Sequence, residues 1–237
     1  MPSPKRATRA ASLESDGDRS PGLTSIDALL ALEAEQGPVE WEPRFDAVSE
    51  LVFTILSQHN SDVNAFRAYE SLRDAFGSWE RVADADPDDI ARVIWNGGLS
   101  RIKAPRIKAV LLDIIERRGS LDLDFLCQLP LEEAKQWLRE LDGVGPKTAA
   151  IVLSFALGMP AMPVDTHIHR VSRRLGLIGP KVTADQAHDT LESSVPPERV
   201  FALHVHIIAH GRQVCRARRP LCDKCVLSER CPSAFRV

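Results

Sequence analysis

Residues 141–149 read Leu141-Asp142-Gly143-Val144-Gly145-Pro146-Lys147-Thr148-Ala149, and this stretch decides how the chain folds. Apolar residues at helical spacing lie on both sides of it, over residues 131–141 and 147–157, so two helices joined by a short turn are expected. Two glycines one residue apart let the backbone turn tightly and leave its amides uncovered. We therefore interpret the stretch as a hairpin between two helices.

The hairpin has the features of a phosphate-binding turn. The backbone N–H groups at the start of its second helix and the dipole of that helix both favour an anion, and such a contact needs no particular base. A P-loop requires Gly-Lys-[Ser/Thr] without a break, but Pro146 follows Gly145. A dinucleotide fingerprint requires a third Gly or Ala where Thr148 stands. An ordinary tight connection between two helices stays open as the simpler interpretation.

Two reactive side chains lie near the hairpin. Lys147 begins an apolar helical stretch, and Asp165 follows eighteen residues later in Val164-Asp165-Thr166-His167, directly before another such stretch. An Asp in that place is a candidate N-cap, a role that holds its carboxylate rigidly. Facing each other across a cleft, Lys147 would be a nucleophile, and Asp165 would accept a proton and stabilise a positively charged sugar.

The rest of the chain predicts an all-α fold. Residues 1–22 are rich in Ser, Pro and charge and are expected to form a flexible tail. Ser25 is the predicted N-cap of the first helix, Asp86-Pro87 starts a helix that ends at Gly97-Gly98, and Thr183 with Gln186 forms a capping box. The predicted helices cover residues 25–32, 45–58, 87–96, 107–118, 131–141, 147–157, 166–175, 183–191 and 197–210. We find no convincing strand and no internal repeat.

Composition and charge narrow the function. The 237 residues are 44% hydrophobic, without an apolar run of eighteen and without the apolar stretch of a signal peptide at the start, so a soluble, cytoplasmic protein is expected. Residues 141–237 hold 13 Lys and Arg against 8 Asp and Glu, a net charge of +5, which leaves −8 for residues 1–140 because the whole chain carries −3. The basic side chains gather as Arg170, Arg173 and Arg174, and as Arg212, Arg216, Arg218 and Arg219. These clusters are either solvated helix faces or a phosphate-binding surface.

Four of the five cysteines, Cys215, Cys222, Cys225 and Cys231, lie in the last 23 residues with the spacing C-x6-C-x2-C-x5-C. Two disulfides are not expected in a chain without a secretion signal. Four thiolates suit either structural zinc or a [4Fe–4S] cluster, and their chemistry alone does not choose between the two. The fifth, Cys127, stands in an apolar stretch and is expected to be a core residue.

With these motifs in hand, the chain resembles the endonuclease III family of helix-hairpin-helix DNA glycosylases over residues 25–232. The hairpin, the Val-Asp-Thr-His stretch and the cysteine spacing agree with that family in order and separation. The resemblance implies a six-helix domain with the hairpin over residues 41–159, and an iron-sulfur domain formed by residues 23–40 and 160–237. It implies that the four cysteines hold a [4Fe–4S] cluster rather than zinc.

The resemblance also implies an activity. Lys147 would be the nucleophile and lyase residue and Asp165 would assist it, in a monomeric base excision repair enzyme that removes oxidised pyrimidines of the thymine glycol type from damaged double-stranded DNA and cleaves the strand by β-elimination. Members of the family also insert side chains into the duplex from two loops. Gln58 or His59 would fill the gap left by the extruded base, and Leu99 would be the wedge. Gly143, Gly145 and Thr148 would contact the DNA backbone.

The sequence departs from the family in two places. The usual gap-filling glutamine falls at His59, with Gln58 one position earlier, and Asp142 puts a negative charge where the hairpin often has proline. Three other functions stay open. A monofunctional glycosylase, such as the adenine-specific type, normally lacks the hairpin lysine. A DNA-binding module without activity would not need the pair of Lys147 and Asp165, and a zinc-bound scaffold protein is the third alternative.

Overall fold

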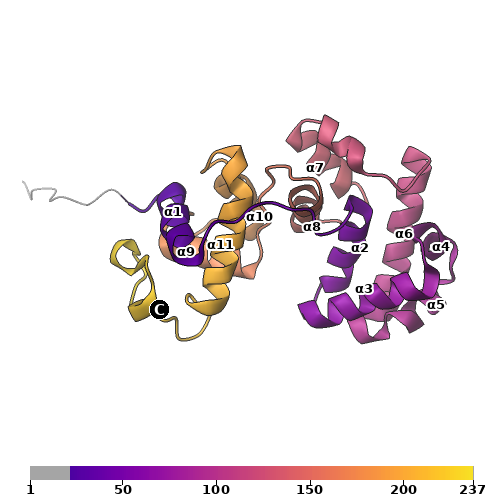
Figure 1. Ribbon diagram of the computed structural model, residues 1–237, viewed down its shortest axis with the longest axis horizontal. Coiled ribbons are helices and arrows are strands. Elements are labelled where there is room, and N and C mark those ends of the chain that lie inside the picture. The colour runs from indigo at the N-terminus through magenta and orange to yellow at the C-terminus, as the bar shows by residue number, and fades with distance from the viewer. Residues whose placement is uncertain (1–21, 237) are drawn as a thin grey trace, which may run out of the picture.

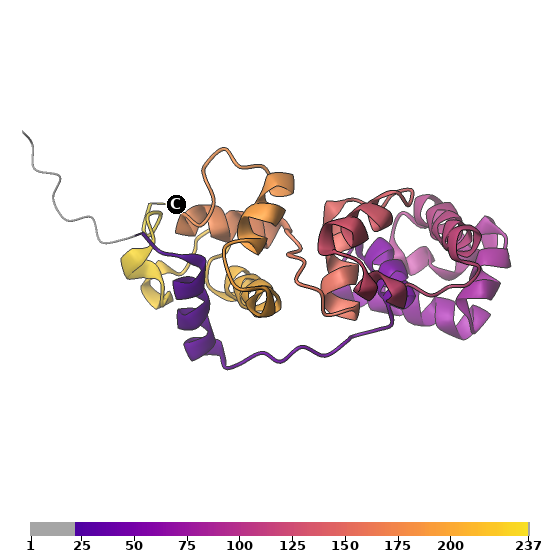
Figure 2. The same ribbon diagram turned by 90° about the horizontal axis from the view of Figure 1, so that it is seen from above.

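The computed structural model describes residues 22–236, and these residues form helices without any strand, which confirms the all-α prediction. The predicted flexible tail lies outside the described residues apart from Gly22. Figures 1 and 2 show the helices gathered in two lobes that lie side by side. Within residues 22–236 no helix is both long enough and apolar enough to cross a membrane.

The first lobe is built around the 19-residue helix α6. The stripe predicted on it, Ile107, Val110, Leu111 and Ile114, is buried in the core of this lobe. The helices that share this lobe are α2 (Ala47–Ser57), α3 (Asp62–Phe76), α4 (Trp79–Asp84), α5 (Pro87–Val93), η1 (Trp95–Gly97), α6 (Ser100–Arg118), η2 (Asp124–Gln128), α7 (Leu131–Arg139), α8 (Pro146–Ile151) and η3 (Val152–Ala156).

The second lobe joins the beginning of the described chain to its end. Leu29 and Leu32 of the first helix are fully buried in the same core as Leu203 and Ile207 near the C-terminus, and α1 lies beside α11, as Figure 1 shows. The helices of this lobe are α1 (Ser25–Gln36), α9 (Thr166–Leu175), α10 (Ala184–Glu192), η4 (Pro197–Arg199), α11 (Val200–Gln213), η5 (Cys222–Lys224) and η6 (Ser228–Arg230). The predicted domain bounds, 41–159 and 23–40 with 160–237, stay a prediction.

Capping signals in the sequence predicted several helix ends correctly. Asp86 caps α5 with Pro87 in its first turn, and Thr183 and Gln186 form the predicted capping box. The first helix is capped by Thr24 instead of Ser25. Helices α3 and α4 were not predicted. The buried face of α3 consists of two alanines and one leucine, so its apolar period is faint in the sequence.

Two further predictions need correction. Cys127 is exposed and not part of the core, because it follows Leu126 in a 3-10 turn that directs Leu123 and Leu126 inward. The helix predicted over residues 147–157 is α-helical only to Ile151 and continues as the π-helical turn η3. There the carbonyl of Ser154 accepts a hydrogen bond from the Trp41 indole at 2.8 Å.

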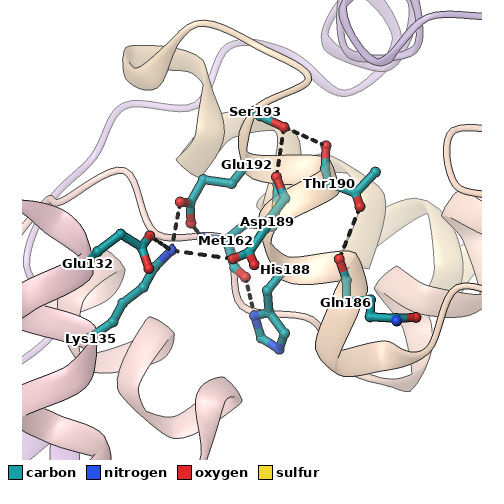
Figure 3. Close-up of polar contacts among 9 residues, drawn as sticks. All are labelled: Glu132, Lys135, Met162, Gln186, His188, Asp189, Thr190, Glu192 and Ser193. Carbon is teal, nitrogen blue, oxygen red and sulfur yellow. Dashed lines mark hydrogen bonds and ion pairs between the residues drawn. The ribbon is translucent and has the colours of Figure 1, made fainter.

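The chain returns from the first lobe to the second through residues 157–165, and polar side chains hold this crossing. Glu192 of α10 accepts hydrogen bonds from the Met162 N–H (3.0 Å) and from the Lys135 ammonium on α7 (2.7 Å), as Figure 3 shows. The imidazole Nδ1 of His188, also on α10, donates to the Met162 carbonyl at 2.7 Å. One network therefore links a helix of each lobe and fixes the backbone three residues before Asp165.

We expect this network to stabilise the fold through the pairing of its charges. Lys135→Met leaves the largely buried Glu192 carboxylate without its cation, and breaking one side of such a pair costs about 3 kcal/mol in the free energy of unfolding. The double variant Lys135→Met/Glu192→Gln removes the isolated charge and keeps an acceptor for the Met162 N–H, so it should lose less than the single variant. Urea unfolding measures both losses. A double variant that is less stable than Lys135→Met would contradict the pairing.

Candidate active site between the two lobes

The hairpin predicted from residues 141–149 is present, and its glycines have different tasks. Gly143 has a φ of +74°, and the Arg106 side chain lies so close that a Cβ there would meet Arg106 Nε at 2.4 Å. Gly145 is exposed, caps α8 and has open space around it. Asp142 is exposed beside them. The hairpin therefore offers open backbone amides at Gly145 and a guanidinium at Gly143, which partly offsets the charge of Asp142.

Lys147 and Asp165 line the same cleft, although they belong to different lobes. Lys147 is exposed in the first turn of α8. Asp165 is the N-cap of α9, as predicted, and its Oδ1 accepts the Ile168 N–H at 2.7 Å. This bond holds the carboxylate rigidly and leaves its second oxygen available to the cleft. The geometry thus provides an amine and an acid group on opposite sides of one opening.

His204 of α11 lies in the same cleft and was not singled out in the sequence. Its Nδ1 donates to the Pro163 carbonyl at 2.9 Å, so it holds the crossing between the lobes one residue beyond the contacts of Met162. Burial disfavours the charged ring and lowers the pKa of His204 to about 4, against opposing attraction from Asp165. His204 is therefore a neutral hydrogen-bond donor near neutral pH.

Aromatic rings form one wall of the cleft. Phe53, Phe66 and Phe155 line it, and the Arg44 guanidinium lies over Phe53 with its carbon 4.4 Å from the ring centroid. Arg44 is paired with the fully buried carboxylate of Glu50, which accepts from Arg44 Nε at 3.0 Å. An apolar wall with a charge-balanced arginine suits a flat, polar ring such as a nucleobase.

The predicted plug and wedge residues differ in exposure. Gln58 is half-buried, accepts a hydrogen bond from Arg106 at 3.1 Å and donates to the Thr148 hydroxyl at 3.4 Å. Thr148 itself is buried and its hydroxyl accepts this bond inside the protein, and its predicted contact to the DNA backbone stays a prediction. His59 and Leu99 are exposed, and both have a positive φ, +52° and +50°. These two side chains are the ones that project from the two loops.

The four C-terminal cysteines, Cys215, Cys222, Cys225 and Cys231, line one cavity. Leu175, Leu221 and His210 line it as well, so the thiols share a largely apolar pocket. Among the described residues no three His, Cys, Asp or Glu side chains converge as ligands of a single metal ion. Four thiols around one cavity fit a larger group with four thiolate ligands, as in a [4Fe–4S] cluster.

The basic cluster of α9 supports this cysteine segment. Arg170 donates to the carbonyls of Gly211 (2.9 Å) and Cys215 (3.0 Å). Arg174 donates to the carbonyls of Arg216 (2.7 Å) and Ala217 (3.1 Å). Two of the three arginines in this cluster therefore bind backbone carbonyls. The sequence suggested either a solvated helix face or a phosphate-binding surface, and neither describes these two side chains.

Comparison with known proteins identifies the family. The model of the HhH-GPD superfamily base excision DNA repair proteins matches residues 52–197. The chain belongs to this superfamily. The endonuclease III of Sulfolobus acidocaldarius is 34% identical over 183 residues, covering 76% of this chain and 79% of that protein. The endonuclease III of Thermotoga maritima is 33% identical over 186 residues, covering 78% and 83%.

A solved non-covalent endonuclease III-DNA complex agrees with this assignment. Its protein is 27% identical and superimposes with a TM-score of 0.75, over 90% of this chain and 97% of that one. The chain is therefore an endonuclease III-like DNA glycosylase of base excision repair that binds DNA, and both the resemblance and the fold expected from it are confirmed.

Sequence reasoning missed several residues of this glycosylase. His204, Arg106 and Arg44 have no motif around them. Their contacts to Pro163, Gln58 and Phe155 join positions distant in the sequence. The available signal in α11 was a group of three histidines, His204, His206 and His210, all of which are buried. Histidines buried on an otherwise apolar helix require specific partners.

The buried state of His204 predicts how stability depends on pH. The unfolded chain binds a proton at His204 below a pH of about 6.5, whereas the folded protein binds it only near pH 4. Between these values the unfolded state holds more protons, so the free energy of unfolding falls as the pH falls. By pH 4 the contribution lost is about 3 kcal/mol. His204→Gln should remove this part of the pH dependence in urea unfolding at pH 4–7.

A matched control tests whether burial is the cause. His59→Gln makes the same chemical change at an exposed position and should leave the pH dependence of unfolding as it was. Equal pH dependence in His204→Gln and the unsubstituted protein would show that His204 is not held neutral.

Proposed function

We propose that this glycosylase removes oxidised pyrimidines of the thymine glycol type from damaged double-stranded DNA and then cleaves the strand at the abasic site. The observation that carries the proposal is the placement of Lys147 and Asp165 on opposite sides of one cleft with an aromatic wall. We expect the enzyme to act as a monomer in the cytoplasm, where its DNA substrate lies.

Lys147 supplies the nucleophile. Its free amine attacks C1′ of the extruded nucleotide, and a C1′–N bond to the lysine forms as the bond to the base breaks. The base leaves with a proton. The sugar ring then opens to a Schiff base, which makes the proton on C2′ acidic. Loss of that proton breaks the C3′–O bond and releases the 3′ phosphate, so the strand is cut without an added cofactor.

Asp165 assists through its negative charge. One carboxylate oxygen is fixed by the Ile168 N–H, so the other keeps a defined position in the cleft. From there it can accept the proton that the Lys147 nitrogen loses as it bonds to C1′, and it can stabilise positive charge on the sugar as the base departs. Its place depends on the crossing segment, because Met162 and Pro163 directly precede it and are held by Glu192 and His204.

The hairpin and two loops would hold the DNA. Backbone amides at Gly143 and Gly145 are suited to a phosphate, with Arg106 adding positive charge at the hairpin. Leu99 is the wedge between bases. His59 fills the gap left by the extruded base, because it is exposed, whereas Gln58 is held by Arg106 and Thr148.

The cysteine cavity would hold the [4Fe–4S] cluster, with Cys215, Cys222, Cys225 and Cys231 as ligands. The donor set supports this assignment, since four thiols line one cavity. The role we propose for the cluster is structural. Bound there, it would fix the basic segment Arg216–Arg219 on the surface, where phosphates could be contacted.

Borohydride trapping tests the reaction. Purified protein and a Lys147→Ala variant are incubated with duplexes that carry thymine glycol or an abasic site, and the covalent protein-DNA product is measured. We expect a trapped product with both duplexes and its loss in the variant, because only an amine at position 147 can form the Schiff base. Absence of any product, with DNA still bound, would contradict the lyase step and favour a monofunctional enzyme.

Iron analysis tests the cysteine assignment. We expect about four iron atoms per chain and broad visible absorbance, as for a [4Fe–4S] cluster. Cys222→Ser should lower both, and Cys127→Ser is the matched control because Cys127 is outside the cavity and exposed. Stoichiometric zinc with no iron would contradict the assignment.

A further inference from the structure

A buried lysine lies between the two loops that carry the plug and the wedge. The Lys103 side chain is 2% exposed, and its ammonium donates to the carbonyls of Leu56 (2.6 Å) and Gly97 (2.9 Å). Leu56 is near the end of α2, just before the plug loop of residues 57–61, and Gly97 begins the wedge loop of residues 97–99. One cation therefore binds the backbone of both loops.

The partners of this ammonium are backbone carbonyls at the ends of two helical segments, α2 and η1. Leu56 is in the last turn of α2, whose carbonyls have no partner within the helix and carry the negative end of its dipole. Burial lowers the pKa of Lys103, so its two carbonyl bonds must offset the loss of hydration. Lys103 is thus costly to bury, and its position is determined by contacts to both loops.

Two more contacts join the loops at the same place. Asn60, in the plug loop, donates its side-chain N–H to the Gly97 carbonyl at 2.7 Å. Gly97 lies so close to α3 that a Cβ there would meet the Ala68 Cβ at 2.9 Å. The wedge loop therefore rests on the helix that follows the plug loop, and Lys103 and Asn60 converge on one carbonyl oxygen.

The exposed residues of both loops adopt strained backbone conformations. His59 and Leu99 have positive φ values, which side chains other than glycine adopt only when the surrounding structure holds them there. Leu99 also accepts the backbone N–H of Lys103 at 2.9 Å. Lys103 therefore holds the wedge loop through its backbone N–H and the plug loop through its side-chain ammonium.

We propose that Lys103 is a positioning residue that couples the plug loop to the wedge loop, so that His59 and Leu99 enter the duplex as one unit. This inference rests on the proposed function, because it assumes that these two side chains enter DNA. Loss of the Lys103 ammonium displaces the His59 and Leu99 side chains together, and this lowers the rate of base extrusion from duplex DNA. A nucleotide in single-stranded DNA needs no wedge and no plug.

The experiment compares two substrates in Lys103→Met, with Lys108→Met as the matched control. Lys108 lies on the same helix and donates to one backbone carbonyl, that of Ala85, at 2.7 Å, away from both loops. Cleavage is measured for a lesion in duplex DNA and for an abasic site in single-stranded DNA. We expect Lys103→Met to lower the ratio of duplex to single-stranded cleavage about ten-fold. Lys103→Arg should recover part of the loss, and Lys108→Met should leave the ratio as it was.

A mutant cycle measures the coupling itself. In the unsubstituted protein, His59→Ala and Leu99→Ala should each remove most of the duplex rate, so that the double variant loses little more than either. In the Lys103→Met background both substitutions should have small effects. If Lys103→Met does not fold, Asn60→Ala, which removes the second link, takes its place and should shift the ratio in the same direction.

Two results would overturn the coupling. One is an equal loss on both substrates in Lys103→Met, and the other is additivity of His59→Ala and Leu99→Ala that the Lys103 substitution does not change. Failure of the proposed function looks different, because the unsubstituted protein would then cleave neither substrate.

Discussion

The polar contacts that hold the crossing segment, residues 157–165, are the constraint on which the geometry of the candidate active site depends. Lys147 lies on α8, which packs in the first core through Ala149, and Asp165 caps α9, which packs in the second core. The backbone between the two lobes therefore sets their relative position. Glu192 and His188 bind the two backbone groups of Met162, and His204 binds the carbonyl of Pro163. Two buried histidines and a largely buried glutamate thus hold the connection between the lobes in one conformation and support the Asp165 carboxylate.

The same device recurs elsewhere in the molecule. Lys103 binds the backbone carbonyls of two loops, and Arg170 and Arg174 bind the carbonyls of the cysteine segment. In each case a cation or a neutral imidazole satisfies carbonyls that no helix satisfies, and a functional segment is held as a result. The irregular parts of this protein are ordered by side chains from the helices beneath them.

Positive charge is therefore used in two ways. Part of the basic excess of residues 141–237 is engaged with the protein's own backbone, while Arg106 stands at the hairpin, where a phosphate would lie. A count of charges along the sequence does not separate these uses, because both need the same residue type. The number of basic residues in the sequence is therefore larger than the number of basic side chains that are free to contact DNA phosphates.

Local chemistry was enough to predict the helical class, the hairpin and the N-caps of α5, α9 and α10, and to single out Lys147 and Asp165 as candidates, because each depends on neighbours within a few positions in the sequence. Sequence reasoning missed α3, because the apolar period of this helix is faint. It also placed Cys127 in the core, because the sequence does not show that a 3-10 turn directs Leu126 inward and leaves Cys127 exposed. Tertiary structure alone brought Lys147 and Asp165 to one cleft, placed His204 beneath them and buried Lys103 between two loops. These contacts join residues far apart in the chain, so no local spacing encodes them, and only the packing of the two cores decides them.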